Sequence, residues 1–295
     1  MNRDTLRSAI APEWLPWLSA ALLLVLAAAL TEGLVRSLRR GGHYDWRAFA
    51  ATFGDVLGRR AVDALTLAFG LSLAAPLLAW LYAHRLATLT PDHAGTLALL
   101  FVGQEFCYYW HHRAAHRVRW FWATHCVHHS PNELTLASAL RLGWTGQVSG
   151  GALFFAPLVW LGFSPFAVLA AVALNLLYQF WLHATWIPKL GPLEWLFNTP
   201  SHHRVHHGSN SEYLDCNYGG VLIVFDRLFG THVAERADLP PRYGLTTPLH
   251  SYNPLRIALH GWLQLAQDLA AARGWRRRLQ TLFGPPPPAR TQQAP

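Results

Sequence analysis

The residues in this chain best suited to chemistry are its histidines, and they are clustered. Ten of the 17 histidines lie in two short segments, six between residues 111 and 129 and four between residues 202 and 207. Imidazole is the commonest side-chain ligand for transition metals, and His-rich tracts of this kind are typical of metal sites. The sequence therefore predicts a metal centre built from both segments.

The spacing within the segments indicates two ions rather than one. His112 and His116 are four residues apart, which on a helix places both rings on one face where they can share a metal. Two further motifs have the pattern His-x-x-His-His. In each, the first histidine faces the other two across one helical turn, whereas the adjacent pair diverges by about 100° and can point at different metals. The motif histidines are His125, His128 and His129 in the first, and His203, His206 and His207 in the second.

Four residues beside these motifs are weaker candidates. His183 ends an apolar stretch and should emerge at the depth of the other histidines, so we predict that it is a ligand. His202 is expected either as an extra ligand or as a residue that hydrogen-bonds to one, and His111 as an outer or structural residue. Gln179 could bind metal or orient a ligand, although amides are poor ligands for iron beside imidazole. The other histidines lack partner spacing and are expected at the surface or membrane interface: His43, His84, His93, His232, His250 and His260.

The ligand types favour iron. Structural zinc is closed by four ligands, often thiolates, whereas eight or more imidazoles exceed what one tetrahedral ion can use. Cys107, Cys126 and Cys216 form no Cys-x-x-Cys pair and are expected to be ordinary small apolar residues. A flexible His-rich buffer for zinc or nickel is the rival interpretation, and the bulky apolar residues around the motifs argue against it.

The elements that must position the histidines are apolar helices. Of the 295 residues, 52% are hydrophobic and only 14% are charged, which is typical of a protein whose solvent is lipid. We therefore predict an all-α integral membrane protein with about four to five hydrophobic helices and a cytosolic helical His-rich metal cap. The spans are expected at about residues 14–35, 61–82, 94–110, 147–162 and 166–183, the last two as a hairpin.

Arginine placement predicts the orientation of the chain. Six arginines crowd residues 36–60 and should hold this loop in the cytoplasm, and counting spans places both histidine segments on the same face. The expected location is the inner membrane in a bacterium or the endoplasmic reticulum in a eukaryote, with a multi-pass topology. The formal net charge of +8 suits an anionic membrane, and nucleic acid is not expected as a partner.

Three regions are predicted along the chain. Residues 1–92 form N-terminal transmembrane helices, residues 93–232 the catalytic metal domain, and residues 233–295 a C-terminal amphipathic helix followed by a disordered Pro-rich tail. The amphipathic helix would suit either a membrane surface or packing on the catalytic part.

Four linked motifs resemble the fatty acid hydroxylase, or sterol desaturase, superfamily of membrane di-iron enzymes. They are Tyr108 to His116, His125 to Ser130, Asn175 to His183, and Asn198 to Gly208, and the match continues through Asn217-Tyr-Gly and Asp226 to Thr231. The resemblance implies a cytosolic cap over two irons. It implies these ligands: His112, His116, His125, His128, His129, His203, His206 and His207, with His183 and His202 also at family positions.

Further residues are interpreted through the same resemblance. Asp215, Asn217 and Asp226 are expected to fix the loop after the last histidine motif, although ordinary turn chemistry would explain them equally well. His111 and Glu105 differ from the family pattern and are expected beside the metal.

The predicted reaction is oxygen-dependent hydroxylation of an aliphatic C–H bond of a lipid, with no catalytic residue beyond the metal ligands. No cytochrome-like or iron–sulfur motif is visible, so an external electron donor or redox partner is required. The motifs are most similar to the branch of the superfamily that cleaves alkyl glycerol ethers, which implies a reduced pterin. Alternatives are a sterol, acyl-lipid or carotenoid hydroxylase or desaturase and, from another class, a metal-binding membrane transporter, which should place its ligands in mid-span.

Overall fold

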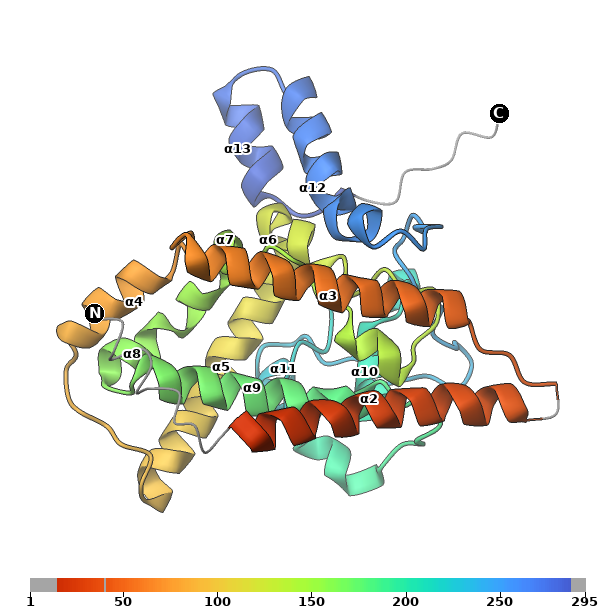
Figure 1. Ribbon diagram of the computed structural model, residues 1–295, viewed down its shortest axis with the longest axis horizontal. Coiled ribbons are helices and arrows are strands. Elements are labelled where there is room, and N and C mark those ends of the chain that lie inside the picture. Colours follow the sequence, from red (N-terminus) through yellow and green to blue (C-terminus); the bar gives the residue numbers. More distant parts are fainter. Residues whose placement is uncertain (1–14, 40, 288–295) are drawn as a thin grey trace.

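The computed structural model describes residues 15–39 and 41–287, and the regular elements in this part of the chain are all helices (Figure 1). The all-α prediction is confirmed. The long helices are α2 (Leu15–Leu38), α3 (Trp46–Ala68), α5 (Ala94–Arg117), α9 (Pro165–Leu182) and α12 (Pro254–Ala271). The short α-helices are α4 (Ala75–Ala83), α6 (Arg119–His125), α7 (Gly146–Ser149), α8 (Ala156–Leu161), α10 (Pro200–His206), α11 (Val224–Leu228) and α13 (Trp275–Phe283). Single turns of 3₁₀ helix are η2 (Leu136–Leu140), η3 (Gly151–Phe155), η4 (Gly191–Trp195) and η5 (Ser211–Tyr213).

Two of the described helices, α2 and α9, are long and apolar enough to cross a membrane. Helix α9 begins where Pro165 follows the Ser164 cap, whose hydroxyl accepts a hydrogen bond from the Ala167 N–H, and it ends at Leu182. Both helices leave large apolar side chains uncovered, such as Leu24 at 71% and Leu174 at 67% exposure. Such surface is costly in water, and a lipid surrounding removes the cost.

Two of the predicted spans are wrong as continuous helices. Residues 61–82 are interrupted because α3 ends at Ala68 and Gly70 adopts a left-handed conformation with φ of 63°. Residues 147–162 are divided into α7, η3 and α8, and Gly150, which has φ of 82°, separates α7 from η3. Helix α5 extends the predicted 94–110 span to Arg117, but it is not among the two helices apolar enough to span.

The helices enclose two apolar clusters, one at each end of α9. One joins α5, α8 and the start of α9 through buried residues that include Tyr108, Val159 and Phe163. The other joins Ala29 of α2 to Ala137 of η2 and to Ala184, just after α9. Figure 1 shows α5 running obliquely towards the centre of the molecule, where its C-terminal end lies next to α6.

Helix α3 anchors the segment that follows the first histidine motif. The Asp55 carboxylate accepts hydrogen bonds from the Leu142 N–H at 3.2 Å and from the Trp144 indole N–H at 2.9 Å. The Thr52 hydroxyl and the Ala48 carbonyl accept hydrogen bonds from the buried Arg141 guanidinium. Polar groups that α3 buries are thereby satisfied, and residues 141–144 are fixed against the helix.

We expect Gly58→Ala to weaken this anchor. A Cβ at Gly58 would lie 2.0 Å from Cζ2 of Trp144, whose ring is held by its bond to Asp55. Overpacking of this kind destabilises by about 1–3 kcal/mol, measured as a lower unfolding temperature in detergent. Gly146→Ala is the matched control, because a Cβ added there would point into open space. Equal unfolding temperatures for the two variants would contradict the packing argument.

The C-terminal helices differ in how they meet the rest of the protein. Helix α12 packs on α3 and α6, and its Ile257 forms a buried cluster with Ala51 and Val127. Of the two positions expected for this amphipathic helix, α12 therefore adopts the one packed on the catalytic part. Helix α13 buries none of its residues, and Figure 1 shows α12 and α13 projecting together from one side of the body. The predicted disordered tail falls partly on residues 288–295, outside the described residues.

Candidate metal centre

Nine of the ten histidines predicted as ligands converge in two groups. In each group one nitrogen per ring can be chosen so that all lie within 4.8 Å of one another. The two groups are neighbours, since His129 stacks on His207 with ring centroids 4.4 Å apart. The first histidine group is His112, His116, His125, His129 and His206, and the second histidine group is His128, His183, His203 and His207.

The two His-x-x-His-His motifs exchange their middle histidines. His125 and His129, four residues apart, join the first group, and His128 between them joins the second. The second motif is the mirror case, since His203 and His207 join the second group and His206 joins the first. Neighbouring rings diverge as the helical repeat predicts, while rings four apart stay together. Each group is therefore built from both motifs.

The remaining members of the groups come from the ends of two long helices. His112 and His116 occupy the last turns of α5, and His183 is the residue that caps the C-terminal end of α9. The second motif lies on α10, which starts at Pro200 and ends with His207 as its cap. The first motif starts at the end of α6. Helix ends thus bring all nine rings to one region near the centre of the fold.

Backbone carbonyls fix the orientation of four of these rings. The Nδ1 atoms of His112 and His206 lie 2.8 Å from the carbonyl oxygens of Tyr218 and Cys216. Those of His128 and His183 lie 3.1 and 3.0 Å from the carbonyl oxygens of Arg141 and Gln179. Because a carbonyl oxygen can only accept a hydrogen bond, each Nδ1 carries the proton and each Nε2 presents a lone pair to its group.

The resulting arrangement suits cations. His112 Nε2 lies 3.0 Å from His125 Nε2, and His203 Nε2 lies 3.2 Å from His183 Nε2. The Nε2 atoms of His116 and His206 are buried and have no hydrogen-bond partner in the described part of the chain. Converging lone pairs without protons are unfavourable unless a positive ion lies among them. An all-imidazole donor set of this size fits transition metals such as iron.

The loop after the second motif supports the first histidine group. Asp215 and Asn217 adopt left-handed conformations with φ of 59° and 54°, which turn the Cys216 and Tyr218 carbonyls towards their histidines. The buried Asp226 carboxylate accepts hydrogen bonds from the N–H groups of Tyr218 and Gly219, both at 2.7 Å. The expectation that Asp215, Asn217 and Asp226 fix this loop is confirmed.

Three other candidates lie outside both groups. His202 Nε2 is 3.3 Å from His232 Nε2, so His202 is not placed as a ligand. The Gln179 side chain accepts a hydrogen bond from the Tyr108 hydroxyl at 3.0 Å and donates to Asn175. His111 packs against Phe154 and Phe155. His111 belongs to neither histidine group, so the expectation that it lies beside the metal is wrong. The alternative expectation, a structural role, agrees with its packing.

Glu105 is also displaced from the expected position. Its carboxylate accepts hydrogen bonds from the Val221 and Leu222 N–H groups, both at 2.8 Å, and so ties α5 to the loop after Asn217. It supports the site from outside. The three cysteines are free and buried, which agrees with their interpretation as apolar residues.

Two histidines expected at the surface are not there. His260 is buried on α12, with its Nδ1 2.6 Å from the Ile257 carbonyl oxygen, and His232 is half-buried against His202. No spacing rule in the sequence indicates the contact of His232, because its partner His202 lies 30 residues away. His43 and His250 are exposed, as expected.

Burial predicts a strong pH dependence for the metal-free protein. It lowers the pKa of His128 to about 4 and that of His183 to about 3. In the unfolded chain these groups titrate near 6.5, so their stabilising contribution is complete above that pH and is lost as the pH falls towards 4. One such histidine accounts for about 3 kcal/mol. We expect the unfolding temperature of metal-free protein to fall steeply from pH 7 to pH 5, and a flat profile would contradict this burial.

Comparison with known proteins agrees with the geometry. Residues 97–231 form a segment that matches the fatty acid hydroxylase family model. All nine converging histidines lie within it.

Individual proteins with similar sequences include two kinds of lipid-modifying enzyme. The chain is 40% identical to the alkylglycerol monooxygenases of Xenopus tropicalis and Homo sapiens over 203 residues, which cover 69% of this chain and 45% of each relative. It is 33% identical to the ornithine lipid hydroxylase OlsE of Rhizobium tropici over 128 residues, 43% of this chain and 38% of the relative. The chain thus spans less than half the length of these curated relatives, and no solved structure matches it.

Proposed function

We propose that this chain is a membrane-bound non-haem di-iron monooxygenase that hydroxylates an aliphatic C–H bond of a lipid. The observation that carries the proposal is the convergence of nine histidines in two adjacent groups inside the segment that matches the fatty acid hydroxylase family model. The first histidine group would hold one iron and the second histidine group the other. When bound, the irons supply the activation of molecular oxygen.

The chain's own residues contribute ligand geometry. The carbonyls of Tyr218, Cys216, Arg141 and Gln179 hold four rings with Nε2 directed into the groups. Burial keeps the histidines neutral, which preserves their lone pairs for metal and limits the entry of water. The domain proposed to contain the reaction is residues 93–232, between N-terminal membrane helices at 1–92 and C-terminal helices at 233–295.

An alkyl glycerol ether is the first substrate to test, because the relatives with 40% identity are alkylglycerol monooxygenases. Hydroxylation of the carbon beside the ether oxygen gives a hemiacetal that breaks down to an aldehyde and glycerol. The electron donor would be external, with a reduced pterin as first choice. An acyl lipid is the second candidate, favoured by the similarity to an ornithine lipid hydroxylase.

The deciding experiment supplies purified, iron-loaded protein with oxygen, a competent reductant and a panel of ether lipids, acyl lipids and sterols. Mass spectrometry follows release of aldehyde or gain of one oxygen atom. Aldehyde formed only from a glycerol ether supports the narrow proposal, whereas oxygen gain on another lipid supports the broad one. If no lipid in the panel shows oxygen-dependent turnover, both the narrow and the broad proposals are ruled out.

The metal centre is proposed to face the cytoplasm. Arg36, at the end of α2, donates a hydrogen bond to Glu133 at 3.1 Å and lines the same cavity as Thr185, just after α9. The C-terminal ends of α2 and α9 therefore lie together with the histidines, beside the arginines of residues 36–60 that favour the cytoplasmic face. Reporters fused after Thr145 and at the C-terminus should both report the cytoplasm. An exterior signal from either fusion would contradict this orientation.

A further inference from the structure

Helix α13 is amphipathic, and the body of the protein leaves most of its apolar face uncovered. Four of its nine residues, spaced i, i+4, i+7 and i+8, form this face: Trp275, Leu279, Leu282 and Phe283. Trp275 is 67%, Phe283 61% and Leu279 44% exposed. Contiguous apolar side chains that stay exposed mark a contact with another surface.

The other side of α13 is polar and basic. By the helical repeat, Arg276 and Arg278 lie at the two edges of the apolar face, and Arg277 lies opposite it. Residues 273–295 contain five arginines and no acidic residue. Within the described part of the chain, no acidic side chain pairs with the arginines of residues 273–278. Their positive charge is therefore available to an anionic partner.

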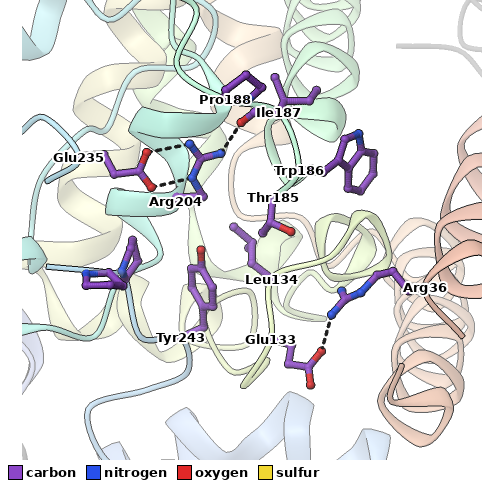
Figure 2. Close-up of a pocket in the computed structure, with 12 residues that line it drawn as sticks. Arg36, Glu133, Leu134, Thr185, Trp186, Ile187, Pro188, Arg204, Glu235 and Tyr243 are labelled. Carbon is purple, nitrogen blue, oxygen red and sulfur yellow. Dashed lines mark hydrogen bonds and ion pairs between the residues drawn. The ribbon is translucent and has the colours of Figure 1, made fainter. Parts of the chain in front are cut away.

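The arginines that line the largest described cavity are, by contrast, neutralised. Figure 2 shows two ion pairs in this cavity of about 510 Å³, which lies between the end of α2, the segment after α9, and α10. Arg204 donates to both carboxylate oxygens of Glu235 at 2.7 Å, and Arg36 donates to Glu133 at 3.1 Å. A guanidinium that already binds a carboxylate offers little to a second anion. An anionic surface is therefore attracted to α13 more strongly than to this cavity.

Two contacts fix α13 beside the end of α5 that carries His112 and His116. The Arg119 N–H, two residues after α5, donates a hydrogen bond of 2.9 Å to the carbonyl of Gly284, which directly follows α13. The Arg119 guanidinium pairs with Asp268 of α12, the helix that precedes α13. In Figure 1, α13 runs across the direction of α2 and α9, the two helices long and apolar enough to span. A helix that lies along a membrane surface has this orientation relative to the spans.

We propose that α13 docks on the cytoplasmic surface of the bilayer, with its apolar face among the lipid chains and its arginines on the phosphates of anionic lipids. Tryptophan and arginine are residue types that this boundary favours. The inference is independent of the proposed reaction, although the side of the membrane rests on the proposed orientation. A second copy of the chain fits less well, because two α13 helices would bring like charges together. Nine residues also offer far less than the roughly 800 Å² per partner of a stable interface.

An environment-sensitive dye on the apolar face of α13 tests the docking in the full chain. Leu279→Cys is labelled with a nitrobenzoxadiazole group, since the three native cysteines are buried. Single chains are placed in nanodiscs of phosphatidylcholine alone, or with phosphatidylglycerol as about a quarter of the lipid. We expect brighter, blue-shifted emission in the anionic discs, and quenching there by spin-labelled lipid. Phe283→Cys should behave in the same way, whereas Gln280→Cys, on the polar side, is the matched control and should give equal emission in both discs.

Removal of the charge tests the choice of anionic lipid. Arg276→Gln, Arg277→Gln and Arg278→Gln together should lower the docking equilibrium constant about 100-fold, since each arginine near an anionic surface contributes about a factor of five. Emission from the apolar face that is equal in neutral and anionic discs, or unaffected by the three changes, overturns the proposal. A blue shift seen only in vesicles that hold many chains, and not in single-chain discs, assigns the face to a second copy and also overturns it. Because no lipid oxidation is measured, none of these outcomes bears on the proposed function.

Discussion

His112→Ala and His183→Ala are each expected to lower the iron content of the purified protein from about two ions per chain towards one. His112 belongs only to the first histidine group and His183 only to the second, so each change opens one site and leaves the other ligand set intact. Lipid oxidation should fall by more than about 100-fold in both, because loss of a ligand exceeds the effect of losing a residue that merely orients one. Elemental analysis after anaerobic reconstitution, together with the lipid assay, measures both effects.

His43→Ala and His250→Ala serve as controls for this prediction. The His43 side chain is 78% exposed, and neither residue belongs to a histidine group. Both variants should keep two irons and full activity. A fully active His183→Ala enzyme with unchanged iron content would remove His183 from the ligand set.

Asp226→Ala is expected to destabilise the fold and to empty the first histidine group. The change leaves the buried N–H groups of Tyr218 and Gly219 without an acceptor, which costs about 3 kcal/mol or more. The Tyr218 carbonyl that orients His112 then loses its support. Thermal unfolding should occur at a lower temperature, and one iron should be lost more readily to a chelator than the other.

Asp238→Ala is the matched control for Asp226→Ala. Asp238 is exposed and pairs with the exposed Arg236, so its removal should change stability by less than about 0.5 kcal/mol. If Asp226→Ala has the same unfolding temperature as the control and retains both irons, the loop does not position the site.

The residues of the site could be predicted from the sequence, because the helical repeat relates residues that are close together in the chain. Residues four apart on a helix face one direction, which accounts for His112 with His116 and for His203 with His207. The same repeat makes adjacent histidines diverge, but it cannot say to which group His128 or His206 turns. That depends on how α6 and α10 approach each other, which is a property of tertiary packing.

The helices were less predictable than the ligands. Apolar composition alone makes residues 61–82 and 147–162 resemble spans, and single glycines in left-handed conformations divide them. A glycine in the middle of an apolar run is compatible with a helix, so its role as a terminator emerges only from the folded backbone. Likewise, backbone carbonyls that orient His128 and His183 leave no mark on residue type.

The exchange of middle histidines between the two motifs has a consequence for synthesis of the protein. The chain emerging from the ribosome carries His112 to His129 long before His203 to His207, yet neither group is complete without both. If iron binds as proposed, a partly made chain lacks His206 of the first histidine group and His203 and His207 of the second, so neither ligand set is complete. Iron loading would then follow the arrival of α10, so that an oxygen-reactive centre forms only once its protective shell is closed.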